Sequence, residues 1–416
     1  MKDGEGRVSA RDTTALTWDY TKKSLLWLNV RLLWAFGVWP LSNSRLHFVT
    51  KSILFLLAVG NAIENTLGVW ANLGDMEEVT YSLMNAFTIA AGVAKTGHFF
   101  LFQGRYCLLV RRVDAIVSSQ RGYCESDPEM LAVTRRCRKM ALRMTVAAFT
   151  YLTALCLIWA LSPVVVHPGE RWLPFNHFPL EPAPLPLYYE LSYAVQSASS
   201  LLYIQVSFAV DFFFTVAMII ITEQLMILNA RLAQLHLYSG GGKLRITATR
   251  VLRKVTTEDR DDMYDELCLC IDTHQEIMRL ISFLDSVMNP IVLTQFMLSV
   301  MAACLTLYQQ TYSPDGNSVM KSASYLPTPG IEVFVYCWGA HSIREQGEAV
   351  SEAAYSCSWF DGSPRIKRAL RMVMCRAHKP LVVTAGRLYA INRATFLSLV
   401  NASYSYFALL SRIHNR

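Results

Sequence analysis

Long runs of hydrophobic residues recur along the chain, and shorter segments rich in Lys and Arg separate them. A run of about 20 apolar residues is long enough to cross the hydrocarbon core of a bilayer as an α-helix. Seven runs approach this length, and the first two contain scattered polar residues. They cover residues 46–70, 79–102, 141–166, 190–228, 288–308, 326–343 and 391–416. The pattern therefore predicts an all-α membrane protein with seven transmembrane helices.

The basic residues between these runs predict the orientation. Connections that carry most Lys and Arg remain in the cytoplasm. The basic segments are 1–45, with seven Lys and Arg, 104–143 with nine, 231–279 with eight and 344–393 with nine. The alternate connections, 71–80, 163–190 and 309–325, each hold one or none. We therefore expect a cytoplasmic N-terminus and an outer C-terminus, which is the reverse of a G-protein-coupled receptor.

Two segments predict helices that extend beyond the bilayer. Residues 190–228 are about twice as long as a span requires, and residues 259–287 place apolar side chains at helical spacing in a charged segment. With the amphipathic stretch 366–376 they could bundle in the cytoplasm. The expected divisions are a cytoplasmic N-terminal segment (1–45), helices one to four (46–230), a cytoplasmic linker and anchor helix (231–287), helices five and six (288–345), cytoplasmic anchor helices (346–390) and the last helix (391–416).

Composition supports the membrane class. The chain is 53% hydrophobic and 17% charged, whereas soluble domains carry about 25% charged residues. The net charge of +7 could indicate a nucleic-acid partner, but the basic residues border the spans, where they set orientation. All ten cysteines fall in spans or inner segments, so no extracellular disulfide is expected. We find no phosphate loop, HExxH motif or nucleophile elbow, and predict neither an enzyme nor a metal or cofactor site.

Three connecting segments have recognisable character. Residues 18–36 form a partly amphipathic pattern that favours a helix on the membrane surface. Residues 163–189 contain seven prolines, which is typical either of a stiff outer lid or of a plain connector. Residues 239–260 begin with three glycines in a row and are basic, which indicates a flexible linker.

Several short motifs resemble those of insect odorant receptors. Near the C-terminus these are Gly386, Thr395-Phe396 and the run Ser403-Tyr404-Ser405-Tyr406-Phe407. Two further fragments agree with the resemblance: Gly37-Val38-Trp39-Pro40, and Tyr336-Cys337-Trp338-Gly339 followed by Ala353, Tyr355 and Trp359. The resemblance implies an odorant-gated non-selective cation channel in the plasma membrane of olfactory sensory neurons. It also implies a mixed tetramer with the odorant receptor co-receptor, joined through the cytoplasmic anchor helices.

A small hydrophobic ligand should bind in an apolar pocket between spans, with few polar groups. The resemblance implies a pocket among spans two, three, four and six. The aromatic, sulfur and hydroxyl side chains on their outer halves are the candidates: Met84, Phe87, Thr88, Cys156, Trp159, Tyr203, Ser207 and Phe334. Each of them could equally be a packed core residue. Such a pocket suits volatile esters, alcohols, ketones or terpenoids, and no ionic group for a charged ligand is evident.

Two ionisable residues lie within the predicted spans, where such groups are candidates for function. Lys95 is expected to reach toward the membrane surface, and Asp211 to contact a neighbouring helix. Neither spacing indicates a proton relay.

The last helix is the candidate pore lining. By resemblance, Leu409 and Ile413 match a nonpolar constriction, and Arg412 lies at the position of a polar residue near the outer opening. Leu and Ile four residues apart share one face of a helix, and a ring of such side chains can close a channel by dewetting. A gustatory receptor channel and, less favoured, a carrier or a G-protein-coupled receptor remain alternatives.

Overall fold

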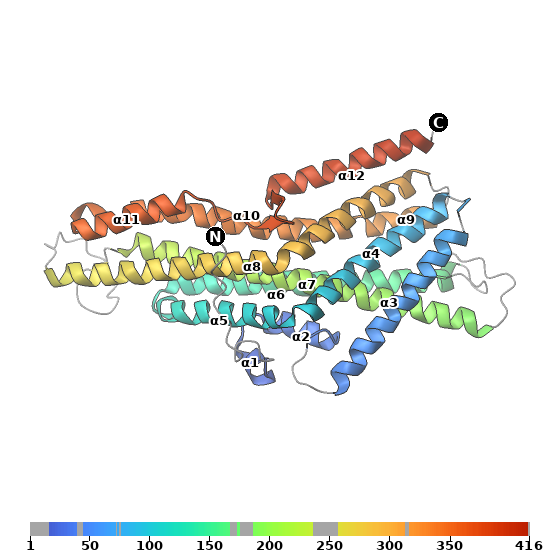
Figure 1. Ribbon diagram of the computed structural model, residues 1–416, viewed down its shortest axis with the longest axis horizontal. Coiled ribbons are helices and arrows are strands. Elements are labelled where there is room, and N and C mark those ends of the chain that lie inside the picture. The colour runs from blue at the N-terminus through green and yellow to red at the C-terminus, as the bar shows by residue number, and fades with distance from the viewer. Residues whose placement is uncertain are drawn as a thin grey trace.

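The computed structural model describes residues 16–39, 45–71, 73–74, 76–166, 173–174, 186–235, 257–312 and 316–414. Over these residues the chain is almost entirely helical, and the long helices run side by side along the molecule (Figure 1). The helices are α1 (Trp18–Lys23), α2 (Trp27–Ala35), α3 (Arg45–Ala71), α4 (Met76–Leu101), α5 (Gln103–Ser126), α6 (Pro128–Val166), α7 (Pro186–Ala233), α8 (Thr257–Tyr312), α9 (Gly316–Tyr325), α10 (Pro327–Ser356), α11 (Pro364–Ala377) and α12 (Arg393–His414), with a short 3-10 helix η2 (Trp359–Asp361). The strands β1 (Thr384–Ala385) and β2 (Tyr389–Ala390) form an antiparallel hairpin.

The seven predicted spans correspond to α3, α4, α6, α7, α8, α10 and α12. Among the described residues, four helical stretches are long and apolar enough to cross a membrane by composition alone: Val49–Ala71, Pro128–Val165, Tyr189–Ala233 and Met263–Tyr312. Helices α4, α10 and α12 are more polar, but with 26, 30 and 22 residues each is long enough to span. Much of the polarity of α4 and α10 is turned inward, as the site below shows.

The longest helices extend well past a bilayer. Helix α7 has 48 residues and α8 has 56, so their lengths are about 72 and 84 Å against a hydrocarbon core of about 30 Å. The expected anchor helix ending at residue 287 and the span starting at 288 are parts of one helix, because α8 continues through Pro290 without a break. Helix α10 likewise continues past residue 343 to Ser356, and α6 begins at Pro128 rather than 141.

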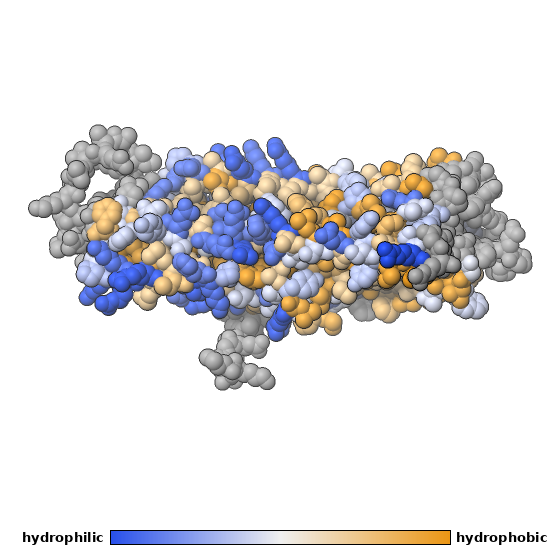
Figure 2. Space-filling model, turned by 90° about the horizontal axis from the view of Figure 1, so that it is seen from above, coloured by the Kyte–Doolittle hydropathy of each residue, from blue (hydrophilic) through white to orange (hydrophobic). Residues whose placement is uncertain are grey.

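The surface divides the molecule into two parts. Figure 2 shows hydrophilic side chains gathered mainly over one half of the length and hydrophobic side chains over the other. Helix α6 makes the same change along its own course: Arg135 and Arg136 are exposed near its start, whereas Val146, Leu157 and Ile158 are exposed further along. Exposed apolar side chains on a long helix are suited to lipid, so the membrane half begins after the basic turns of α6.

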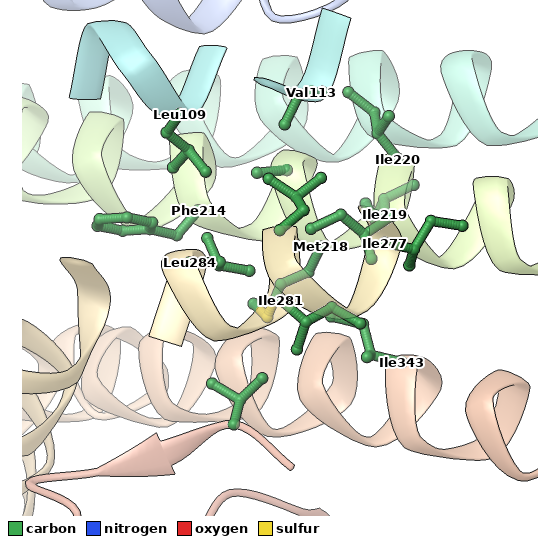
Figure 3. Close-up of a cluster of buried hydrophobic side chains, with 14 of the residues drawn as sticks. Leu109, Val113, Phe214, Met218, Ile219, Ile220, Ile277, Ile281, Leu284 and Ile343 are labelled. Carbon is green, nitrogen blue, oxygen red and sulfur yellow. The ribbon is translucent and has the colours of Figure 1, made fainter. Parts of the chain in front are cut away.

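A hydrophobic core joins α5, α7, α8 and α10 in the half with the polar surface (Figure 3). Its buried side chains include Leu109, Val113, Phe214, Met218, Ile219, Ile220, Ile277, Ile281, Leu284 and Ile343. Helix α5 was not predicted, since its charged residues placed it in a basic connection. Burying its apolar face against α7 and α8 stabilises the helical extensions outside the bilayer.

The N-terminal helices pack against the body and also present tryptophans outward. Leu26, Val30 and Leu33 are fully buried, and the helical character expected of residues 18–36 is present. Trp18, Trp27 and Trp34 are exposed, which suits a membrane–water interface. Ser24 Oγ donates a hydrogen bond to Asp114 on α5 at 3.0 Å, and burial raises the pKa of that carboxyl.

The proline-rich connection is shorter than expected. Pro163 lies inside α6, and Pro186 is the first residue of α7, a position where the missing N–H costs no helical hydrogen bond. Most of the predicted lid, residues 167–172 and 175–185, lies outside the described residues, as does the linker from 236 to 256.

A tight turn precedes the last helix. Residues 386–388 connect β1 to β2, and Gly386 and Arg387 have positive φ angles of 61° and 56°. The Leu388 N–H donates to the carbonyl of Ala385 at 3.0 Å, which closes a tight turn. A Cβ on Gly386 would lie 2.6 Å from Leu293 Cδ2 on α8, so the turn is also pressed against that helix. The hairpin therefore fixes where α12 starts.

Candidate ligand-binding site

Three ionisable side chains meet in the interior of the membrane half. Lys95 on α4 pairs with Asp211 on α7 at 2.7 Å and with Glu332 on α10 at 3.4 Å. All three side chains are buried, with Lys95 only 2% exposed. A buried charge is tolerated only when it is paired and hydrogen-bonded, so this cluster ties three spans together.

Neutral side chains complete the cluster. Lys95 also donates to Ser207 Oγ at 2.7 Å, and Ser207 donates to Glu332 at 3.2 Å. Tyr336 donates its hydroxyl to Asp211 at 2.7 Å, and Gln295 on α8 donates to the other oxygen of Glu332. The network therefore reaches a fourth helix, α8.

A small cavity of about 20 Å³ adjoins this cluster. That volume is room for about one water molecule. Its walls come from α4, α7, α8, α10 and the end of α9, and they combine aromatic and aliphatic side chains with polar groups. The lining residues are Phe87, Thr88, Ala91, Ile204, Ser207, Phe208, Gln295, Leu298, Ser299, Ala302, Tyr325, Thr328, Pro329 and Glu332.

Three of the predicted ligand residues, Phe87, Thr88 and Ser207, line this cavity. Two more lie directly behind its wall: Met84 and Trp159 pack in one buried cluster with Tyr325. The rings of Trp159 and Tyr325 are 6.1 Å apart, and Tyr325 shares a hydrogen bond with Thr88 at 2.6 Å.

The other three predicted residues lie elsewhere. Cys156 is buried on α6, which contributes no lining residue. Tyr203 donates its hydroxyl to the carbonyl of Leu54 on α3. Phe334 is 47% exposed and meets Phe396 of α12 edge to face, with ring centroids 5.6 Å apart. The residues of α8 take the place that was expected for span three.

Sequence reasoning missed Glu332, Gln295 and Tyr325, and misjudged Lys95. Lys95 does not reach the membrane surface, because its ammonium is enclosed by two carboxylates. The expectation for Asp211, a helix–helix contact, is correct. The available signal was the presence of Lys95, Asp211 and Glu332 in three different predicted spans, since charges at that depth are expensive unless they pair. An ionic group therefore does border the cavity.

The residues of the predicted constriction are exposed on this single chain. Leu409 and Ile413 are 56% and 64% exposed on α12, and Arg412 beside them is also exposed. Leu397, Val400 and Tyr404 extend the same exposed apolar character toward the start of the helix.

Helix α12 is held at both ends. The hydroxyls of Tyr312 on α8 and Ser411 share a hydrogen bond near its C-terminus. Near its N-terminus Asn289 on α8 donates to Thr384 Oγ1 in the hairpin at 2.7 Å, and the rings of Phe296 and Tyr389 stack 6.4 Å apart.

The fold is similar to that of a solved insect olfactory receptor. The structure of OR5 from Machilis hrabei in complex with eugenol matches with a TM-score of 0.72 over 93% of this chain and 97% of that chain, at 18% sequence identity. A second structure of the same receptor matches with a TM-score of 0.71. At 18% identity the similarity establishes the fold, and this fold contains the seven spans.

Sequence relatives point the same way. Odorant receptor 10 of Aedes albopictus is 32% identical over 145 residues, and Odorant receptor Or2 of Anopheles gambiae is 29% identical over 153 residues. These matches cover 35% and 37% of this chain and 39% and 40% of the relatives, so about two fifths of each relative's length is spanned. The odorant receptor coreceptor of Anopheles gambiae is 28% identical over 145 residues, which is 34% of this chain and 30% of the coreceptor.

A family model covers far more of the chain. The model described as 7tm Odorant receptor matches residues 75–404, which include every residue of the cavity wall and most of α12. The matched family is one of odorant receptors and is not an enzyme family. This multi-pass membrane protein therefore belongs to the 7tm odorant receptor family.

Proposed function

We propose that this chain is the odorant-binding subunit of a ligand-gated, non-selective cation channel. A small volatile molecule binds at the cavity between α4, α7, α8 and α10, where Phe87, Thr88 and Ser207 contact it and Met84 and Trp159 support the wall. Cys156, Tyr203 and Phe334 act only through neighbouring helices in this account. The solved relative in complex with eugenol supports a small organic ligand for this fold.

One observation carries the proposal: the helices that wall the cavity also hold α12. Glu332 lies in the cavity wall on α10, and two residues further Phe334 contacts Phe396 of α12. Gln295 lies in the wall on α8, and the adjacent Phe296 stacks on Tyr389 in the hairpin that leads into α12. A ligand that spreads the wall would therefore displace both of these contacts, which lie near the start of the last helix.

Ligand binding opens the channel only if the open arrangement binds the ligand more tightly than the closed one. In this account Leu409 and Ile413 form the nonpolar constriction, and their separation admits hydrated ions. Arg412 opposes cations at the mouth unless the other subunits dilute its charge.

The exposed apolar side chains of α12 support assembly with other subunits. A ring of four last helices would surround one pore and shield Leu397, Val400 and Leu409 from water in the closed state. The coreceptor among the relatives supports a mixed tetramer with the odorant receptor co-receptor in the plasma membrane of olfactory sensory neurons. The helical extensions with the polar surface would supply the contacts between subunits in the cytoplasm.

The test is heterologous expression of this chain with and without the co-receptor, with a panel of volatile compounds applied during whole-cell recording. The proposal predicts compound-evoked cation currents that require both chains and differ from those of the co-receptor alone. Discrete single-channel steps would separate a channel from a carrier. Compound-independent currents identical to the co-receptor alone, despite surface expression of both chains, would contradict it.

A further inference from the structure

The charged cluster in the wall of the cavity has no hydrogen-bond donor to spare. The three hydrogens of the Lys95 ammonium are directed to Ser207, Asp211 and Glu332. Ser207 in turn donates to Glu332. The cluster therefore leaves no donor free for the cavity, although it holds two carboxylates for one ammonium.

The hydroxyls of Thr88 and Tyr325 at the cavity are also committed. Thr88 donates to the backbone carbonyl of Met84 at 2.9 Å, so its hydrogen bond with Tyr325 uses the tyrosine hydrogen. One hydroxyl is left over: Thr328 Oγ1 is buried without a hydrogen-bond partner among the described protein atoms.

Gln295 adds an acceptor that nothing uses. Its Nε2 donates to Ser299 at 2.7 Å and to Glu332, whereas its Oε1 is buried without a partner among the described protein atoms. Exchanging Nε2 and Oε1 of Gln295 would place the amide oxygen against the Glu332 carboxylate, and two oxygens without a hydrogen repel. The hydrogen bonds that Nε2 donates therefore fix the orientation of the amide. The Gln295 side chain is 2% exposed, and an unmet acceptor at that depth is costly.

From the unmet acceptor of Gln295 and the excess of carboxylate over ammonium, we propose that the cavity binds an O–H or N–H group of a small, otherwise apolar ligand, with Glu332 and Gln295 as the acceptors. The inference rests on the proposed function and names its ligand class. Alcohols, phenols and amines can donate to Gln295 Oε1, whereas ethers, esters and ketones offer only acceptors and leave this oxygen without a partner. The single-water volume matches one such head group.

The apolar body of the ligand is accommodated by the side chains around the seat. Phe87, Ile204 and Leu298 line the cavity and are only half-buried, so they can rotate outward without disturbing the charged cluster. Gln295 also borders a second cavity of about 120 Å³, beside Lys95 and Pro290, which gives the amide room to adjust.

The test uses four small aromatic probes of nearly equal size: benzyl alcohol and benzylamine as donors, anisole as an acceptor only, and ethylbenzene as neither. Binding to the purified full-length chain in lipid nanodiscs is followed by thermal stabilisation, so channel opening is not required. We expect the better donor to bind at least about tenfold more tightly than anisole, since a buried acceptor gains a partner only from a donor.

Glu332→Gln should reduce this preference, because the replacement keeps the shape and removes the negative charge. Glu348→Gln is the matched control on the same helix, where the carboxylate is half-exposed and pairs with Arg344, and it should leave the preference unchanged. Should Glu332→Gln fail to fold, Gln295→Met removes the second acceptor at similar length and should narrow the preference likewise.

The relative affinity of the two donors then distinguishes a neutral from a protonated head group. Equal binding of anisole and the donors, no binding of any donor, or a preference that persists in both site variants would overturn the proposal. If the donors bind more tightly but evoke no current, the proposed channel function is contradicted and the inference about the ligand class stands.

Discussion

At the scale of single residues, the interior of the membrane half is governed by an unequal set of charges. Asp211 and Glu332 share one ammonium, Lys95, and the pairs lie at 2.7 and 3.4 Å. Removing one partner of a buried pair is costly because the remaining charge loses its compensation. In the proposed site, ligand binding would therefore be coupled to stability, since Glu332 would serve both.

Replacing the ammonium should destabilise the protein more than any surface change. We expect Lys95→Met to cost about 3–5 kcal/mol, since it leaves two carboxylates facing each other out of water. The double variant Lys95→Met with Asp211→Asn should recover part of that loss. Arg344→Gln, which breaks a half-exposed pair at 2.8 Å, should cost at most about 1 kcal/mol.

Unfolding of the detergent-solubilised variants by heat or denaturant measures these differences. A Lys95→Met protein as stable as the Arg344→Gln protein would show that the cluster is not a structural pair.

The cavity residues show which positions the sequence could reveal. Phe87, Thr88 and Ser207 were predicted because aromatic and hydroxyl side chains on bundle-facing positions stand out in an apolar span. Glu332 did not stand out, since it sits between Ile331 and Val333 in a run that reads as one span. Its role depends on Lys95, which is 237 positions away in the chain, and no local pattern reports that pairing.

At the scale of helices, the close approach of α4 to α7 depends on a glycine. A Cβ on Gly92 would lie 2.8 Å from the backbone carbonyl oxygen of Tyr203, and backbone cannot rotate away as a side chain can. Small residues permit such contacts between helices in a membrane. This contact sets the spacing of two cavity walls, because Ala91 and Ile204 beside it both line the cavity.

Gly92→Ala should therefore force α4 and α7 apart, lower thermal stability and weaken the response to ligand at unchanged surface expression. Gly97→Ala on the same helix is the control: a Cβ there meets nothing within 4 Å, and alanine favours the helix by up to about 1 kcal/mol. Thermal melts and concentration–response curves check both. Gly92→Ala behaving like Gly97→Ala would mean that the two helices have room to adjust.

Helix existence was predictable from the sequence, but helix ends were not. The runs of apolar residues located all seven spans because lipid requires length and apolarity together. The apolar positions of α5, among them Leu109 and Val113, were obscured by charged neighbours and became clear only through their burial against α7 and α8. Pro290 did not end α8, which shows that a proline lowers helical stability without dictating a terminus when packing on both sides holds the helix.

At the scale of the whole molecule, the chain has two connected halves that differ in surface and in content. The half with the apolar surface contains the cavity and α12, whereas the half with the polar surface contains the extensions of α6, α7, α8 and α10 together with α11 (Figures 1 and 2). Helices α7, α8 and α10 pass through both halves. The core in Figure 3 therefore fixes the ends of the cavity walls that face the polar half. A ligand can then shift the walls mainly at their outer ends, where α12 carries Leu409 and Ile413.

The most direct test of the central claim is cysteine accessibility at the last helix. A charged, membrane-impermeant thiol reagent is applied from outside to the Leu409→Cys variant, co-expressed with the co-receptor, with and without an activating compound. The Leu73→Cys variant is the control, since Leu73 is 65% exposed in the connection between α3 and α4, which is predicted to lie outside. The account predicts that the compound accelerates modification of the Leu409→Cys variant and that modification blocks the current, with no effect on current in the control. Modification at the same rate in both conditions, with currents left intact, would contradict it.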